Sequence, residues 1–399
     1  MMKLLSIPFL DELAAFRRDI HAHPELAFHE TRTADLVARE LAAYGIEAHR
    51  GLAGTGVVGV LRKGESRRAI GLRADMDALP LMEKNGFAHA SRNPGRMHAC
   101  GHDGHLAMLL GAARHLAENL ASLAFDGAVY FIFQPAEESE GGGKLMVEDG
   151  LFRQFPMDAV FGLHNWPGLP LGEMAVMLGP VMAGTCVFEI RLHGQGCHAA
   201  LPHQGADTLV AASHLVLALQ TIVSRNVHPC EGAVVSVTQM HGGDALNVIP
   251  DDTVLRGTIR YFKPEVEALI EAAIRRIGAG IEHTFGVQVH VALDQRYPVT
   301  VNSAPQTALC QEVAASVLGP EKVRQDEAPS MAAEDFSFML REKPGCYAWL
   351  GNGPGSDGHT LHSPHYDFND ANLAIGVSYW VRLVETALRP AGTPFCQNA

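Results

Sequence analysis

One short segment concentrates the reactive side chains of this sequence. Residues 97–105 read Met-His-Ala-Cys-Gly-His-Asp-Gly-His and hold a thiol, three imidazoles and a carboxylate. On one helix Cys100 and His102 would point in different directions, but in a loop broken by Gly101 and Gly104 both can converge on one metal ion. A nucleophilic Cys100 with a nearby histidine as its base is the alternative. The sequence thus predicts the functional site in this segment.

Further candidate ligands follow the ends of predicted strands. Apolar runs at 69–74, 128–134 and 158–163 are followed by Asp75 and Asp77, by Glu137 and Glu138, and by His164, respectively. In open α/β sheets, ligands bind at the carboxyl ends of the strands. We therefore expect these side chains to gather at one edge of a sheet.

The donor types indicate a metal site. The candidate ligands are Cys100, His102, His164, His362 and one of the adjacent glutamates. Mixed sulfur, nitrogen and oxygen donors suit zinc, and also manganese, cobalt or nickel. Five donors exceed the needs of one tetrahedral site, whereas a pair of divalent ions would use them all and would generate a hydroxide nucleophile at neutral pH.

The adjacent carboxylates Glu137 and Glu138 can divide the work of hydrolysis. One can bind metal, while the other takes the proton of the attacking water and passes it to a leaving nitrogen. In the middle of a helix, two adjacent glutamates would usually be two solvated side chains. Here they follow the end of a predicted apolar strand, which favours a functional role. The glycines at 141–143 permit close approach of the backbone, although a flexible loop explains them equally well.

The periodicity of apolar residues predicts two domains. Helices are expected at 9–20, 31–44, 105–120, 303–318 and 371–388, and strands at 56–62, 69–74, 128–134, 158–163 and 346–350. This alternation predicts a catalytic α/β domain with a mostly parallel central sheet, formed by residues 1–184 and 297–399. Residues 185–296 follow the order β-α-β-β-α-β, which predicts an inserted ferredoxin-like α+β domain.

Composition excludes several classes of protein. The 399 residues carry a formal net charge of −13 without a basic stripe, which argues against a nucleic-acid partner. No run approaches the roughly 18 uninterrupted apolar residues of a membrane span. The cysteines are scattered without a framework spacing and predict a reducing, cytoplasmic location. They are Cys100, Cys186, Cys197, Cys230, Cys310, Cys346 and Cys396.

Six segments, in this order, resemble a known enzyme family. They are His23-Pro24-Glu25-Leu26, Arg73-Ala74-Asp75-Met76-Asp77-Ala78-Leu79-Pro80, Cys100-Gly101-His102-Asp103-Gly104-His105, Gln134-Pro135-Ala136-Glu137-Glu138, Gly162-Leu163-His164 and Leu361-His362-Ser363-Pro364. Together they are similar to the dinuclear-metal amidohydrolases of the aminoacylase and hippurate hydrolase family. Plant indole-acetyl-amino-acid hydrolases and some bacterial carboxypeptidases belong to the same family. The resemblance spans nearly the whole chain.

The resemblance implies a role for each candidate ligand. Cys100 would bridge two ions, with His102 and His164 on one ion and Glu138 and His362 on the other. Glu137 would be the general base, and Asp77 would orient a ligand. Relatives in the wider superfamily have a histidine where Asp75 stands and an aspartate where Cys100 stands, which points to the hippurate hydrolase branch.

The resemblance also implies that the inserted domain is a lid that commonly pairs two subunits. His198, in Gly196-Cys197-His198-Ala199-Ala200, would hydrogen-bond the oxyanion, and in some relatives it reaches the site of the other subunit. Asn247 and Arg260 would bind the α-carboxylate of the substrate. For Arg260, an ordinary outward position on a lid strand is an equally good explanation.

The expected activity is hydrolysis of the amide bond of an N-acyl amino acid, such as hippurate, by a homodimer or homotetramer. A dipeptidase or carboxypeptidase and an N-acyl-diaminopimelate deacylase would use the same machinery. Two other classes compete with these: a metal-free cysteine hydrolase, and a catalytically silent ligand-binding dimer. The cysteine hydrolase would leave Glu137, Glu138, His164 and His362 unexplained, and the silent dimer would be expected to have lost a ligand or the base.

Overall fold

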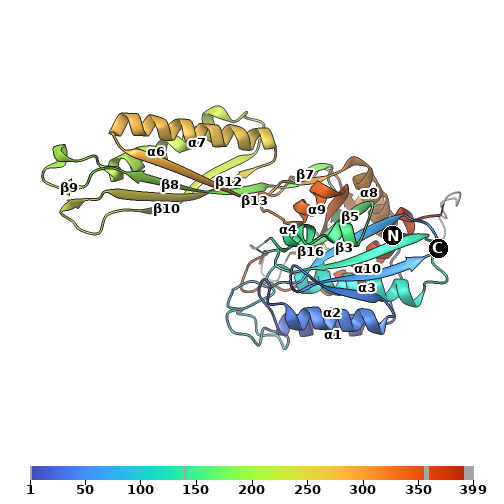
Figure 1. Ribbon diagram of the computed structural model, residues 1–399. Coiled ribbons are helices and arrows are strands. Elements are labelled where there is room, and N and C mark those ends of the chain that lie inside the picture. Colours follow the sequence, from blue (N-terminus) through green and yellow to red (C-terminus); the bar gives the residue numbers. More distant parts are fainter. Residues whose placement is uncertain (1, 139–140, 355–358, 391–399) are drawn as a thin grey trace. The chain divides into compact units, whose positions relative to one another are not determined.

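The computed structural model describes residues 2–138, 141–354 and 359–390 (Figure 1). Its contacts divide the chain into two compact units. The first comprises Met1–Val181, Val301–Ala328 and Asp335–Ala399, and the second comprises Met182–Thr300 and Pro329–Glu334. Cys396, Ser139 and Glu140 lie outside the described residues.

The first unit is built on an eight-stranded sheet in the order β1-β2-β4-β3-β5-β16-β6-β15. The strands are β1 (Glu47–Leu52), β2 (Gly56–Lys63), β3 (Ala69–Asp75), β4 (Gly127–Gln134), β5 (Ala159–Pro167), β6 (Met174–Ala175), β15 (Val323–Arg324) and β16 (Gly345–Gly353). The central neighbours β4-β3-β5-β16 pair in parallel, whereas β1, β2 and β4 pair antiparallel. The predicted α/β class with a mostly parallel central sheet is confirmed.

Burial explains why the central strands read as apolar runs rather than alternating ones. Every residue of β3, β4 and β16 is buried, as expected for strands covered on both faces. The covering helices are α1 (Leu10–Ala22), α2 (Thr31–Ala43), α3 (His102–Glu118), α4 (Gly142–Glu148), α5 (Leu151–Gln154), α8 (Ala304–Leu318), α9 (Phe336–Glu342) and α10 (Asn372–Ala387). In Figure 1, α1 and α2 lie below the strands, and α4 and α9 lie above them.

Several elements differ from the sequence-based expectations. Helix α3 begins at His102 rather than near residue 105, because Gly101 adopts a left-handed conformation (φ 94°) directly before it. Gly142 and Gly143 belong to α4 and not to a flexible loop. The sequence analysis also missed β1 and α9, whose residues carry weaker apolar patterns.

The second unit contains a four-stranded antiparallel sheet in the order β10-β12-β8-β13. Its main elements follow one another as β8 (Gly184–His193), α6 (Thr208–Thr221), β10 (Ala233–His241), β12 (Asp252–Tyr261), α7 (Pro264–Phe285) and β13 (Gln288–Tyr297). This is a β-α-β-β-α-β order. The two-residue strands β9 (Cys197–His198) and β11 (Val248–Ile249) pair with each other. The short strands β7 (Gly179–Met182) and β14 (Thr300–Asn302) pair with each other, and each has one residue in the second unit and the rest in the first.

One helical stretch, Thr208–Asn226, is long and apolar enough to pass a length-and-composition test for a membrane span. A core helix of a soluble protein passes the same test. Here Leu215 and Leu219 face the core of the second unit, while Val210 and Leu217 are exposed. Helix α6 therefore carries apolar residues on two faces, one packed against the core and the other exposed.

The close packing of α3 gives a stability prediction. A Cβ atom on Gly104 would lie 2.2 Å from the ring of Phe368. We expect Gly104→Ala to lower the free energy of unfolding by about 1–3 kcal/mol, because overpacking forces the ring or the helix to shift. Urea unfolding followed by circular dichroism measures the change.

Gly280→Ala is the matched control for this measurement. Gly280 lies in α7 with nothing within 4 Å of its Cβ position. Alanine should stabilise that helix by about 1 kcal/mol. A Gly104→Ala protein as stable as the wild type would contradict the close packing of α3 on Phe368.

Candidate metal centre

His102 and Cys100 are placed by the turn that starts α3. A Cβ atom on Gly101 would lie 2.1 Å from Asn165 Oδ1, so only glycine fits between the two ligand candidates. His102 Nδ1 lies 2.9 Å from the carbonyl oxygen of Asp77 and 3.3 Å from Asp77 Oδ1. Its Nδ1–H therefore donates to Asp77, which leaves Nε2 as the ring atom that faces the cluster and can bind a metal once it has lost its proton. That Nε2 atom is buried and has no hydrogen-bond partner among the described residues.

His164 is oriented in the same way by its own strand. It lies on β5, where its Nδ1 is 2.6 Å from the carbonyl oxygen of Asn165. Nε2 then points to Cys100, with 3.5 Å between Nε2 and Sγ. Burial holds the pKa of His164 well below its usual value, so the imidazole is neutral and able to ligate a metal.

Glu138 joins two histidines. Its backbone N–H donates to Asp77 Oδ2 over 3.0 Å. Glu138 Oε2 lies 3.4 Å from His362 Nε2, and Oε1 lies 3.8 Å from His102 Nε2. The Oε1 atom is buried and has no hydrogen-bond partner in the described part of the chain. The side chain of His362 is 55% exposed, which makes it the solvent-facing member of the cluster.

These residues form three groups whose donor atoms lie within 4.8 Å of one another. The groups are Cys100–His102–His164, Cys100–Glu138–His362 and His102–Glu137–Glu138. The first two share the thiol of Cys100, as expected for two ions with one common ligand. Divalent metal ions fit this donor set, and they would satisfy two buried atoms, His102 Nε2 and Glu138 Oε1, that have no hydrogen-bond partner among the residues that the structure describes.

The electrostatics of the cluster suit cations. Burial lowers the pKa of His102, but Asp75, Asp77 and Glu138 outweigh it and raise the pKa to about 10. Burial, with Glu138 as the next cause, raises the pKa of the Cys100 thiol well above its usual value. The metal-free protein therefore holds an imidazolium and a neutral thiol where a metal would need an imidazole and a thiolate.

Metal uptake should consequently release about two protons per chain near pH 8, one from His102 and one from Cys100. Isothermal titration calorimetry of the metal-free protein in buffers of different ionisation enthalpy counts these protons. Cys100→Ala should reduce the number by about one. Uptake without proton release would contradict this ligand set.

Behind the ligands lies a second layer that the sequence analysis did not assign. His105 Nδ1 is 2.7 Å from Asp75 Oδ1, and Asp75 Oδ2 accepts a hydrogen bond from Arg73 Nη1 over 2.7 Å. All three side chains are buried. His105 lies in the segment singled out above, but nothing in the local sequence distinguishes a supporting histidine from a ligand.

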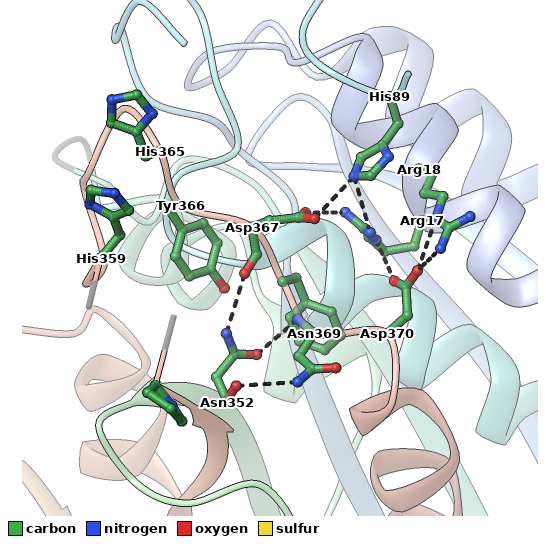
Figure 2. A pocket seen from close by; sticks show the side chains of 12 residues that line it. Arg17, Arg18, His89, Asn352, His359, His365, Tyr366, Asp367, Asn369 and Asp370 are labelled. Carbon is green, nitrogen blue, oxygen red and sulfur yellow. Dashed lines mark hydrogen bonds and ion pairs between the residues drawn. The ribbon is translucent and has the colours of Figure 1, made fainter. Parts of the chain in front are cut away.

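The loop that carries His362 is fastened to α1 by Arg17, which is 1% exposed. Its guanidinium lies 2.8 Å from oxygens of both Asp367 and Asp370, and 3.3 Å from Asp103 Oδ2 in the first turn of α3. Figure 2 shows the carboxylate of Asp367 linked to both His89 and Arg17, and all three residues line a cavity of about 380 Å³. We assign this cavity no ligand, and its ion pairs support the fold of the His362 loop.

The expected lid residues do not lie together. His198 is exposed on β9, and the carbonyl oxygen of Asn247 accepts a hydrogen bond from Ala199 N over 3.0 Å. Arg260 lies at the other end of the sheet, because β12 pairs Arg260 with Thr185 and Asp252 with His193. The eight residue-to-residue steps from Asp252 to Arg260 span about 26 Å of strand.

Arg260 also lacks a carboxylate partner among the described residues. Its Nη1 donates to Thr185 Oγ1 over 2.5 Å and to the carbonyl oxygen of Ile259 over 3.0 Å. Burial lowers its pKa. A half-buried guanidinium without a counter-charge is suited to an anionic group from another molecule.

Comparison with known proteins identifies related enzymes. A hippurate hydrolase of Campylobacter jejuni is 42% identical over 372 residues, covering 93% of this chain and 95% of the relative. An N-acetyl-L-cysteine deacetylase of Bacillus subtilis is 39% identical and covers 95% of this chain and 88% of the relative. Both agree with the resemblance inferred from the sequence motifs.

A solved structure and a family model give the same assignment. The crystal structure of a Bacillus subtilis protein, described as a dinuclear metal-binding peptidase from the M20 family, matches with a TM-score of 0.83 at 33% identity. It covers 95% of this chain and 98% of that chain. The family model of peptidase family M20/M25/M40 matches residues 71–386. The chain therefore belongs to peptidase family M20/M25/M40, whose relatives named above are hydrolases.

Proposed function

We propose that the protein hydrolyses the amide bond of N-acyl amino acids with two divalent metal ions. The observation that carries the proposal is the pair of donor groups sharing Cys100, with Glu137 within 4.8 Å of the ligand atoms of His102 and Glu138. Relatives named hippurate hydrolase and N-acetyl-L-cysteine deacetylase support this substrate class. The donor set of one thiolate, three imidazoles and a carboxylate favours zinc.

The residues of the chain then have defined tasks. When bound, the ions polarise the scissile carbonyl and activate a water molecule. Glu137 takes the proton of that water and delivers it to the leaving nitrogen. Asp77 holds His102 and the Glu138 backbone, so the ligands need no rearrangement during the reaction. His198 donates a hydrogen bond to the developing oxyanion, and Arg260 or Asn247 receives the substrate carboxylate.

The role of Glu137 gives a direct test. We expect Glu137→Gln to keep its bound metal but to lose turnover by about 10²- to 10⁴-fold, because glutamine cannot accept the proton. The measurements are elemental analysis and release of glycine from hippurate. Glu148→Gln is the control, since Glu148 is 54% exposed on α4. Full activity after exhaustive chelation, or an active Glu137→Gln protein, would refute the proposal.

We further infer a homodimer formed through the second unit, with a homotetramer as a possible higher assembly. Strand β10 ends the sheet order, so one of its edges has no strand partner in the described residues. Val210 and Leu217 of the adjacent α6 are 46% and 70% exposed, and Met240 on β10 is 42% exposed. An open strand edge beside apolar side chains suits a second copy of the same surface.

The separation of His198 from Arg260 suggests why catalysis would require a dimer. Arg260 lies near one end of β12, whereas His198 lies on β9, in the β9–β11 pair that follows the opposite end of the sheet at His193 and Asp252. A single second unit is therefore poorly suited to present both to one substrate. Two chains related by a two-fold axis can do so if each active site receives Arg260 from its own chain and His198 from the partner chain. His198 would then act across the dimer.

Mixed dimers test this arrangement. We expect Glu137→Gln and His198→Ala chains, each inactive alone, to regain about half of the wild-type activity when co-expressed with different tags and purified as the doubly tagged species. One of the two sites then combines an intact Glu137 with an intact His198. If His198 acts within its own chain, both sites remain damaged and no activity returns.

The competing functions are distinguished by specific observations. Cys100 is 8% exposed and its pKa is raised, which is the opposite of an activated nucleophile. A silent ligand-binding dimer would not need every ligand and the base, yet all are present. A deacylase acting on N-acyl-diaminopimelate is supported by a relative of that name, 37% identical, from Leuconostoc mesenteroides. Rates on hippurate, N-acetylcysteine, N-acetyldiaminopimelate and a dipeptide rank these substrates.

We also propose a cytoplasmic location. All six cysteines in the described part of the chain are free, as expected in a reducing compartment. Protein purified from the soluble fraction without reductant and titrated with a thiol reagent under denaturing conditions tests this.

A further inference from the structure

A buried carboxylate outside the metal cluster holds the backbone that precedes the catalytic glutamates. Glu30, directly before α2, is 0% exposed. Its Oε1 accepts hydrogen bonds from Phe28 N over 3.1 Å and from Ala136 N over 2.9 Å. Its Oε2 accepts one from Thr55 Oγ1 over 2.7 Å. Three segments far apart in the sequence therefore meet on one side chain.

The two backbone donors are conformationally unusual. Ala136 has φ 55° and Phe28 has φ 60°, which places both in the left-handed region that side chains other than glycine rarely adopt. Such conformations persist only when the surroundings hold them. Without an acceptor, the N–H of Ala136, which is itself 0% exposed, would be buried and unsatisfied.

Ala136 stands directly before Glu137 and two residues before Glu138. A change in the backbone angles at Ala136 would swing both carboxylates away from His102, which lies within 4.8 Å of them. Small displacements of this kind are costly in catalysis, where a shift of about 1 Å can reduce rates by about 10²-fold.

The same loop supports the neighbouring catalytic segment. The carbonyl oxygen of Glu25 accepts a hydrogen bond from Ala78 N over 2.8 Å, and Leu26 forms a parallel bridge with Ala78. Ala78 follows Asp77, the residue that holds His102 and Glu138. Residues 25–30 thus contact both backbone segments that carry the catalytic carboxylates.

We propose that Glu30 is a positioning residue, whose buried carboxyl holds Ala136 in a left-handed turn and thereby aims Glu137 and Glu138 at the metal centre. The inference rests on the proposed role of Glu137. It also gives a function to the segment after the His23-Pro24-Glu25-Leu26 motif, which the metal chemistry itself does not use.

Glu30 acts through its acceptor geometry rather than through its charge. Burial raises the pKa of Glu30 to about 7, and the nearby charge of Asp77 raises it as well. The hydrogen bonds from Thr55 and Ala136 lower the pKa but do not cancel the effect of burial. A neutral Glu30 can keep Oε1 for both N–H groups and donate its own proton from Oε2 to Thr55 Oγ1. A glutamine can reproduce this pattern, whereas an aspartate keeps the charge but is one methylene too short.

The experiment compares Glu30→Gln with Glu30→Asp in the metal-loaded full-length protein. We expect Glu30→Gln to retain kcat within about threefold, and Glu30→Asp to lose kcat by about 10- to 100-fold with little change in KM. Bound metal is measured by elemental analysis, thermal unfolding by circular dichroism, and the φ angle of Ala136 by crystallography. In Glu30→Asp, Ala136 should leave the left-handed region.

Asp158→Ala is the control for a purely structural effect. Asp158 also accepts a backbone hydrogen bond, from Ala69 N over 2.9 Å, but at the amino end of β3, away from Asp75 at its carboxyl end. This variant should lose stability and keep kcat. If Glu30→Asp behaves in the same way, or if Glu30→Asp is active and Glu30→Gln is not, the positioning role is refuted.

Failure of the inference can be told apart from failure of the proposed function. An inactive Glu137→Gln protein with an unaffected Glu30→Asp protein would refute the positioning role alone. An active Glu137→Gln protein would refute the proposed function itself. Should Glu30→Asp fold poorly, Thr55→Val serves as the second variant, because it removes one bond to the same carboxyl. Thr55→Val should then lower kcat while Glu30→Gln retains it. An unchanged kcat and an unchanged Ala136 geometry in Thr55→Val would count against the positioning role.

Discussion

The arrangement of the candidate metal centre depends on Asp77 more than on any single ligand. Its carbonyl oxygen accepts the Nδ1–H of His102, and its Oδ2 accepts the backbone N–H of Glu138. One residue at the end of β3 therefore sets the tautomer of an imidazole and the position of a carboxylate that come from α3 and from the end of β4. Abandoning this geometry would be costly, because the Nδ1–H of His102 and the N–H of Glu138 would each lose the acceptor that Asp77 provides.

Other buried charged groups near Asp77 also connect elements that lie far apart in the sequence. Arg73 binds Asp75, Gln134 and Asp335, and Asp335 in turn accepts the backbone N–H of Gly143 in α4. Arg17 ties the loop of His362 to α1 and to the first turn of α3. Each cation is surrounded by carboxylates that come from different elements. The buried charges are therefore compensated locally, and breaking one member would leave its partners buried without compensation.

The second unit contributes a different kind of constraint. The four-stranded sheet separates its two ends, because each residue of a strand adds about 3.3 Å to its length. His198 on β9 and Asn247 directly before β11 follow the end of the sheet at His193 and Asp252, and Arg260 lies near the other end. A sheet with an unpaired edge strand and exposed apolar residues on the neighbouring helix can join a second copy and present both ends to two sites. Catalysis and assembly are thereby linked in the proposed enzyme.

Local sequence was sufficient for the central strands and for a set of candidate metal donors, which the structure brings within reach of one another. Buried parallel strands require continuous apolar runs, and donors such as Cys100 and His102 occur within short motifs whose glycines reveal a tight turn. The sequence by itself also indicated the class of reaction, because six motifs in the same order resemble a known family of amidohydrolases.

Only the tertiary structure decided which residues support that chemistry. Glu30 and Ala136 are 106 residues apart, and Arg17 and Asp370 are 353 residues apart, so no local pattern could pair them. The same holds for the partnership of His105 with Asp75, and for the opposite placement of His198 and Arg260, which depends on strand register. These features arise from contacts between distant segments, and such contacts exist only once the chain has packed around its sheets.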